Sequence, residues 1–218
     1  MRTILLLLAT AISFAGMTSS LAQVYSLNAV AGIPRILKPG FNLIQNPLDA
    51  GAVGGNVVSN VLAGVPDGTT VYRYTNTPAG SGFIVNDYTT KFRWTDPHMS
   101  MAPGEGVFVW LPPGPDFTNV FIGDVMRGHL VTELSAGFSL VGSKVPQAGK
   151  LVADLGFTPG DDDVVFQHIS GAGYVPASFY TAFGGWDHGD PEIIVGEAFW
   201  VGTPAAKTWM RDFDINKP

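Results

Sequence analysis

The chain carries the same order of sequence blocks twice, and this repeat limits the possible fold more than any other feature. The block PGFNLIQNPL at 39–48 matches AGFSLVGSKV at 136–145, and GEGVFV at 104–109 matches GEAFWV at 196–201. Between them, TVYRY at 70–74 matches VVFQH at 164–168, and GSGFIVNDY at 80–88 matches GAGYVPASFY at 171–180. The offset stays between 97 residues (137 − 40) and 91 residues (171 − 80). This is the pattern of a tandem duplication.

Each copy is predicted to consist of short β-strands. Runs such as FNLIQN, TVYRY and GVFVW are rich in apolar and aromatic residues, and turn-forming stretches such as VPDGTT, MAPGEG and TPGDDD separate them. Only 56–62 and 149–155 suggest a helical turn. We therefore predict an all-β protein of two tandem, closely packed β-sandwich or barrel-like modules related by internal duplication.

The N-terminal residues predict export. Arg2, an apolar stretch and the small residues around Ala22 form the pattern of a cleaved signal peptide, and the apolar stretch is shorter than the ~20 residues that a membrane span needs. We assign 1–22 to a signal peptide, 23–117 to the first β-module and 118–218 to the second. No flexible linker separates the modules, and nothing after Ala22 could span a membrane, so the expected location is secreted, extracellular or periplasmic.

Composition excludes several kinds of function. The chain has no cysteine, which rules out disulfides, thiolate metal sites and thiol catalysis. Its formal net charge is −6, so we expect no nucleic-acid partner. Only 14% of residues are charged, against a usual ~25%, which leaves much of the surface neutral or apolar and suits contact with other molecules.

Glu105 and Glu197 hold equivalent positions, each after a glycine and before an apolar run. Paired carboxylates could act as acid and base, but a catalytic pair needs two different environments, whereas equivalent positions in two similar modules receive similar ones. A glutamate in such a turn can instead cap backbone N–H groups where the strand begins. We predict a structural turn role for both, no catalytic residues and no enzymatic activity.

The loop WDHGDPE at 186–192 suggests a possible metal ligand set of acidic side chains. Asp187 and Asp190 supply oxygen atoms of the kind that bind calcium, although aspartate is also common in solvated turns. No histidine spacing typical of catalytic zinc occurs. No cofactor is expected apart from this calcium alternative.

Aromatic residues suggest a ligand site. Trp94 and Trp186 occupy equivalent loop positions, close in sequence to Tyr88 and Tyr180. Exposed rings could form flat platforms for sugar rings or for a protein surface. The alternative is that each tryptophan closes the end of its own module as part of the core.

The strands GFNLI and GEGVFV, with their counterparts in the second copy, resemble a type of uncharacterised secreted bacterial β-module. Such modules carry a G-[FW]-N-L-[IV] strand and a later G-E-[GA]-[FY]-[FW]-V strand, and they often occur in tandem. The second copy departs from the pattern with Ser139 in place of the asparagine. The resemblance implies a secreted β-protein and brings no established activity.

These observations favour an exported, non-enzymatic structural or interaction protein of the cell surface or extracellular space. Its partner would be another protein or further copies of itself, joined through edge strands such as those at 24–28 and 207–215. The alternative is a carbohydrate-binding protein that holds a polysaccharide on its loop tryptophans. A hydrolase built on the carboxylates is a remote third alternative.

Overall fold

The computed structural model describes residues 30–77 and 79–216, and it confirms the prediction of an all-β protein. The helical segments in these residues are a 3-10 turn, η1 (Gly51–Val53), and one short helix, α1 (Val58–Val61). No helix within this part of the chain is long and apolar enough to cross a membrane. The predicted signal peptide at 1–22 and the proposed edge strand at 24–28 lie outside the described residues.

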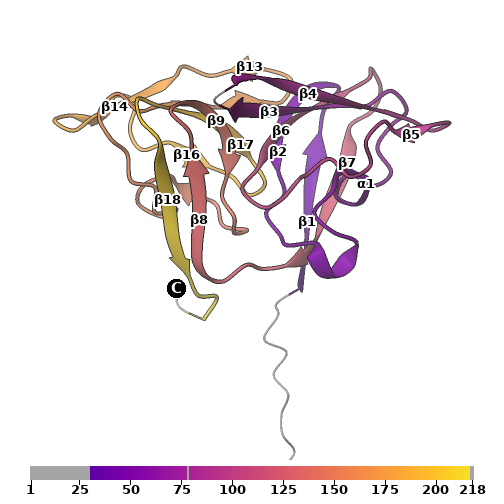
Figure 1. Cartoon of the computed structure of the whole chain (residues 1–218), viewed down its shortest axis with the longest axis horizontal. Helices are drawn as coiled ribbons and strands as arrows, with labels where there is room; N and C mark the ends of the chain where they lie inside the picture. The colour runs from indigo at the N-terminus through magenta and orange to yellow at the C-terminus, as the bar shows by residue number, and fades with distance from the viewer. Residues whose placement is uncertain (1–29, 78, 217–218) are drawn as a thin grey trace, which may run out of the picture.

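Two five-stranded antiparallel sheets form the framework (Figure 1). The first has the order β2 (Gly40–Gln45), β6 (Gly106–Leu111), β3 (Thr70–Thr77), β4 (Gly80–Thr89), β5 (Arg93–Trp94). The second has the order β9 (Gly137–Gly142), β17 (Ala198–Thr203), β11 (Val164–Phe166), β14 (Ser178–Thr181), β15 (Gly185–Trp186). Blocks that match in sequence therefore occupy the same place in both sheets.

Four two-stranded ribbons complete the described structure. The long ones pair β1 (Val30–Leu37) with β7 (Phe117–Asp124), and β8 (Gly128–Leu134) with β18 (Lys207–Phe213). They stand below the sheets on the right and on the left of Figure 1. The short ones pair β10 (Gly149–Lys150) with β16 (Glu192–Ile193), and β12 (His168–Ile169) with β13 (Gly173–Tyr174).

The module boundary predicted between 117 and 118 is too early. Strand β7 pairs with β1 along its whole length, and Phe121 on β7 is 1% exposed in the core of the first module. The chain enters the second module only at β8, so the boundary lies between Asp124 and Gly128. The sequence obscured this because the segment before the second copy matches the segment before the first and also completes the first module.

Each module has its own apolar core between its sheet and its long ribbon. In the first, alternate residues of the central strands, such as Val71 and Val109, point inward and are fully buried. The corresponding residues of the second core include Val165 and Val201, which Trp209 on β18 covers. This alternation places the intervening side chains on the opposite face of each sheet.

The opposite faces of the two sheets pack against each other between the modules. A third buried cluster lies there, made of Leu43, Phe108, Leu140, Ala198, Trp200. The N–H of Gln45 donates to the Gly196 carbonyl oxygen (3.0 Å), and at the equivalent place the N–H of Gly142 donates to the Gly104 carbonyl oxygen (3.1 Å). Contacts exchanged in this reciprocal way describe an approximate two-fold axis between the modules.

Candidate binding face

A set of aromatic side chains extends from this inter-module cluster to the surface. Each module contributes five rings at equivalent positions of its repeat, and most of the rings contact one another edge to face. We call this set the aromatic face: Phe41, Tyr72, Tyr74, Phe83, Phe108 from the first module and Phe138, Phe166, His168, Tyr174, Trp200 from the second.

The hairpin of β3 and β4 reaches across the interface to the second module. The ring centroid of Tyr74 lies 4.7 Å from that of Trp200. Beyond it, Nδ2 of Asn76 donates hydrogen bonds to the carbonyl oxygens of Ala136 (2.9 Å) and Phe138 (3.1 Å). The first module therefore supplies part of the surface above the second sheet.

The hairpin of β12 and β13 makes the reciprocal contact with the first module. His168, which holds the position of Tyr74 in the repeat, places its ring 5.9 Å from that of Phe108, the counterpart of Trp200. Tyr174, the counterpart of Phe83, packs against His168 at 5.2 Å. Each sheet is thus covered in part by the hairpin of the other module.

Two hollows lie between these rings. The first, of about 550 Å³, is lined by Tyr74, Phe138, Phe166, Tyr174, Val175, Ala177, Trp200. The second, of about 400 Å³, is lined by Phe41, Tyr72, Phe83, Phe108, His168, Tyr174. The five rings Tyr74, Phe138, Phe166, Tyr174 and Trp200 correspond to His168, Phe41, Tyr72, Phe83 and Phe108, so the hollows are approximate two-fold mates. Tyr174 lines both, and neither hollow can be formed by one module alone.

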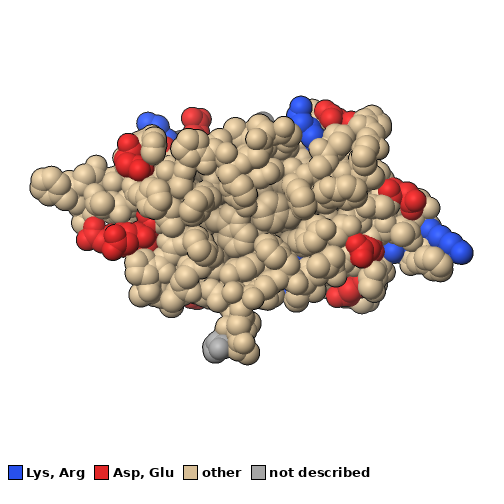
Figure 2. Space-filling model, turned by 90° about the horizontal axis from the view of Figure 1, so that it is seen from above, with Lys and Arg blue, Asp and Glu red and all other residues tan. Residues whose placement is uncertain are grey.

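Among the residues that the structure describes, no charged side chain lines either hollow. Seen from above, the charged side chains lie towards the periphery and the centre is uncharged (Figure 2). Burial lowers the pKa of His168, which keeps its imidazole neutral near neutral pH. The Trp200 indole N–H donates to the Tyr174 hydroxyl at 2.8 Å, so one of the few polar groups here is already satisfied.

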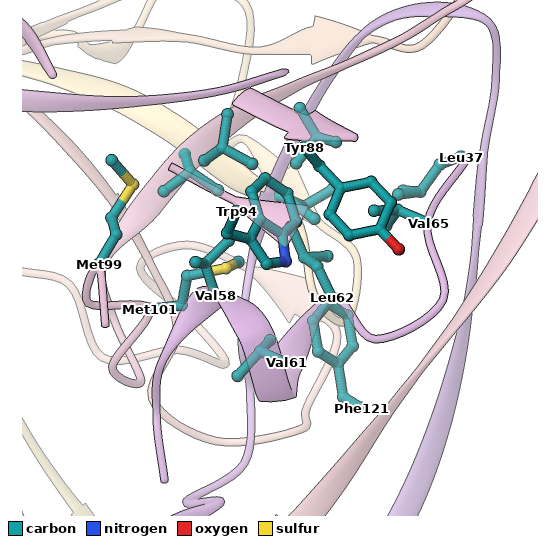
Figure 3. Close-up of a cluster of buried hydrophobic side chains, with 14 of the residues drawn as sticks. Leu37, Val58, Val61, Leu62, Val65, Tyr88, Trp94, Met99, Met101 and Phe121 are labelled. Atoms are coloured by element: carbon teal, nitrogen blue, oxygen red, sulfur yellow. The ribbon is translucent and has the colours of Figure 1, made fainter. Parts of the chain in front are cut away.

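The predicted tryptophan platform is wrong for the first module. Trp94 and Tyr88 are 6% and 8% exposed, and their rings pack together inside the first core (Figure 3). The alternative, in which the tryptophan closes the end of its own module, describes Trp94. The physical reason is that Trp94 lies on β5, which pairs with β4, so that its ring packs against the apolar side chains of α1 in the first core and does not project into solvent.

Trp186 and Tyr180 hold the equivalent place in the second module and are half-buried. Their rings lie 5.2 Å apart, and Trp186 packs on the second core. They are not among the residues that line the two hollows. The structure therefore does not bring the four predicted ligand residues together.

Glu105 and Glu197 have the hydrogen-bond geometry expected of turn caps. Oε2 of Glu105 accepts the backbone N–H of Ala102 (3.1 Å), three residues earlier, and Oε2 of Glu197 accepts that of Ile194 (3.0 Å). The other oxygens accept from equivalent positions of the repeat, Arg73 (3.1 Å) and Gln167 (3.1 Å) respectively.

The two caps differ in environment. Glu105 is ion-paired with Arg73 and its side chain is 35% exposed. Glu197 is buried, and burial raises its pKa, although the hydrogen bonds from Ile194 and Gln167 and the charge of Arg35 partly oppose this. Burial in turn lowers the pKa of Arg35. Burial therefore disfavours the charged form of Glu197, whereas Glu105 is partly exposed and paired with Arg73.

The carboxylates of Asp187 and Asp190 point to different backbone segments. Asp187 accepts the N–H of Phe179 (2.9 Å), whereas Asp190 accepts the N–H groups of Val152 (2.9 Å) and Ala153 (3.0 Å). In the described part of the chain, no three histidine, cysteine or acidic side chains gather as a metal site. These hydrogen bonds give both aspartates a structural task.

Sequence reasoning missed the aromatic face, although a signal for it was present. In both copies, aromatic residues recur at the strand positions that alternate with the buried aliphatic ones, as at Tyr72 and Phe166 or at Phe108 and Trp200. A strand that is apolar on both faces has a second apolar face that is either buried or exposed. Here part of the second face is buried between the modules and part is exposed as the aromatic face.

Fold and face together define an all-β protein of two packed modules that share one uncharged aromatic surface. No protein-family model, curated protein or solved structure matches the chain.

Proposed function

We propose that the chain is an exported, non-enzymatic interaction protein that holds an uncharged, apolar partner on its aromatic face. The observation that supports this most is the construction of the hollows. Each one combines the sheet of one module with the hairpin of the other, and the rings that line it are equivalent in the two halves. Joining two modules in one chain thus creates a surface that neither module has.

Exposure of the rings supports the same function. Phe83 and Tyr174 are 48% and 54% exposed, although each also packs against neighbouring rings. Contiguous exposed apolar surface is costly for a monomer and commonly marks an interaction site. Rings held by their neighbours lose little conformational entropy on binding, which favours association.

The carbohydrate alternative would need hydrogen-bonding groups around the rings, since sugar hydroxyls lose water when they bind. The polar groups that line the hollows belong to tyrosines, one histidine and Trp200, whose indole N–H already donates to the Tyr174 hydroxyl. The hydrolase alternative gains no support because both glutamates take part in equivalent structural hydrogen bonds. Apolar partners therefore fit the face better than sugars do.

Binding of a neutral apolar dye such as Nile red to dilute protein tests this function. We expect dye fluorescence to rise with the unaltered chain and to fall strongly in the double variant Phe83→Ser, Tyr174→Ser. The matched control is Phe183→Ser, which removes a fully exposed ring outside the aromatic face. Equal dye binding by all three folded proteins would contradict the proposal.

A further inference from the structure

We propose that the partner on the aromatic face is a second copy of this chain, docked about a two-fold axis. This inference rests on the proposed function and names the partner for the same surface. It differs from association through edge strands, because it uses the rings on the sheet faces.

The strongest support is continuity with the interface inside the chain. The aromatic face is the outer part of the cluster that joins the modules, and Phe108 and Trp200 belong to both. Within the chain, a ring from one module's hairpin covers the other module's sheet, as Tyr74 does at Trp200. The cover that fits this surface is therefore a β-hairpin ring of the same kind of module.

A second copy offers such rings. Phe83 and Tyr174 stand on the two reciprocal hairpins, and about half of each side chain remains exposed. Because the two halves of the face are equivalent, a copy rotated about a two-fold axis places its hairpin rings opposite the two hollows of the first. Both hollows are then covered in one contact.

Charge agrees with self-association at this face. In a two-fold contact, a charged residue near the axis meets its own copy, which costs free energy through like-charge repulsion and desolvation. The residues that line the hollows carry no such charge, and the charged side chains lie towards the periphery (Figure 2). The whole chain has a net charge of −6, so added salt should tighten the association by screening the remaining repulsion.

Sedimentation velocity over a wide concentration range tests the proposal. The unaltered chain should form dimers reversibly, and more tightly in high salt. The double variant Phe83→Ser, Tyr174→Ser should raise the dissociation constant by about tenfold or more. Phe183→Ser should dimerise like the unaltered chain, and urea unfolding confirms that each variant is folded.

Several outcomes would overturn the second-copy proposal. One is a monomer at every concentration that still binds Nile red through Phe83 and Tyr174; the proposed function would then stand with a different partner. A monomer that binds an apolar peptide or a polysaccharide at the face would identify that partner. Dimers that persist in the double variant would show that the contact lies elsewhere. Loss of dimers in the Phe183→Ser variant would show the same.

Discussion

Gln45 and Gly142 hold the same position in the two halves of the chain, and the side chain of one occupies the space that the other leaves empty. A Cβ atom on Gly142 would lie 2.2 Å from Cγ of Gln45, closer than any real contact. The Gln45 amide crosses between the modules, donating from Nε2 to the Ser143 carbonyl oxygen (2.8 Å). The approximate two-fold symmetry is therefore broken at its centre, where only one side chain fits.

Exchanging these two residues tests the two-fold packing. Gly142→Gln alone should lower the free energy of unfolding by about 1–3 kcal/mol through overpacking, and Gln45→Gly alone by a similar amount through lost hydrogen bonds. The exchanged double variant should recover part of the summed loss, because removing the Gln45 side chain relieves the clash at 2.2 Å but leaves a Cβ at position 142 at 2.8 Å from the Glu197 carbonyl oxygen. Urea unfolding measures all three, and purely additive losses would refute the symmetry argument.

The two glutamate caps should respond differently to the loss of charge. Glu105→Gln should lower the free energy of unfolding by about 1 kcal/mol, since it weakens the contact with Arg73 and the bonds from Ser100 and Ala102. Glu133→Gln, an exposed carboxylate, is the control. Glu105→Gln variants as stable as the control would argue against the cap.

Glu197→Gln should leave stability unchanged or raise it at neutral pH. A raised pKa means that the folded state favours the protonated acid, so the stability from this group is complete below its ordinary value of 4.5 and is lost as pH rises. In parallel urea titrations, the free energy of unfolding of the variant should therefore rise relative to that of the unaltered chain as pH rises from about 4.5 towards 7. A falling difference would show that the charged form is preferred.

We expect His168 to change stability in a higher pH range than Glu197 does. Its lowered pKa means that stability is complete above its ordinary value of 6.5 and is lost as pH falls below it, because the unfolded chain takes up the proton first. His168→Phe should remove this loss. We expect the thermal midpoints of the two proteins to diverge in favour of the variant as pH is lowered from about 7.5 to about 5; parallel curves would assign no role to His168.

Trp94 should matter for stability and not for binding. Trp94→Phe should lower the free energy of unfolding by about 1–2 kcal/mol, because it leaves a cavity in the first core. Nile red binding by the folded variant should match that of the unaltered chain. A loss of dye binding in the folded variant would show that Trp94 takes part in ligand binding.

The repeat predicted the fold well because the same strand and turn patterns occur in both copies. The alternation of apolar residues and the turn-forming stretches determine the strands. Both copies have the same capped turn before β6 and β17, and this allowed the structural role of Glu105 and Glu197 to be predicted. The boundary was misplaced because β7 closes the first module with a segment that resembles the entry to the second. Pairing of β1 with β7 is a long-range property that local pattern does not contain.

The aromatic face was harder to predict because exposure depends on tertiary packing. Trp94 and Phe83 are both aromatic residues near turns, yet Trp94 is buried in the core of its own module, whereas Phe83 stands on a hairpin that crosses to the other module. Tyr74 contacts Trp200 only because the modules pack face to face. No pattern within one copy indicates a contact that needs both.

The most direct test of a face shared by both modules is a Nile red titration of variants that each alter one hollow. Ala177→Asp places a charge in the first hollow, and Phe83→Ser removes a ring from the second. Each of these variants should lose part of the Nile red binding. Tyr174→Ser should weaken dye binding in both hollows, because Tyr174 lines both. Binding that is unchanged in all three folded variants would contradict the account.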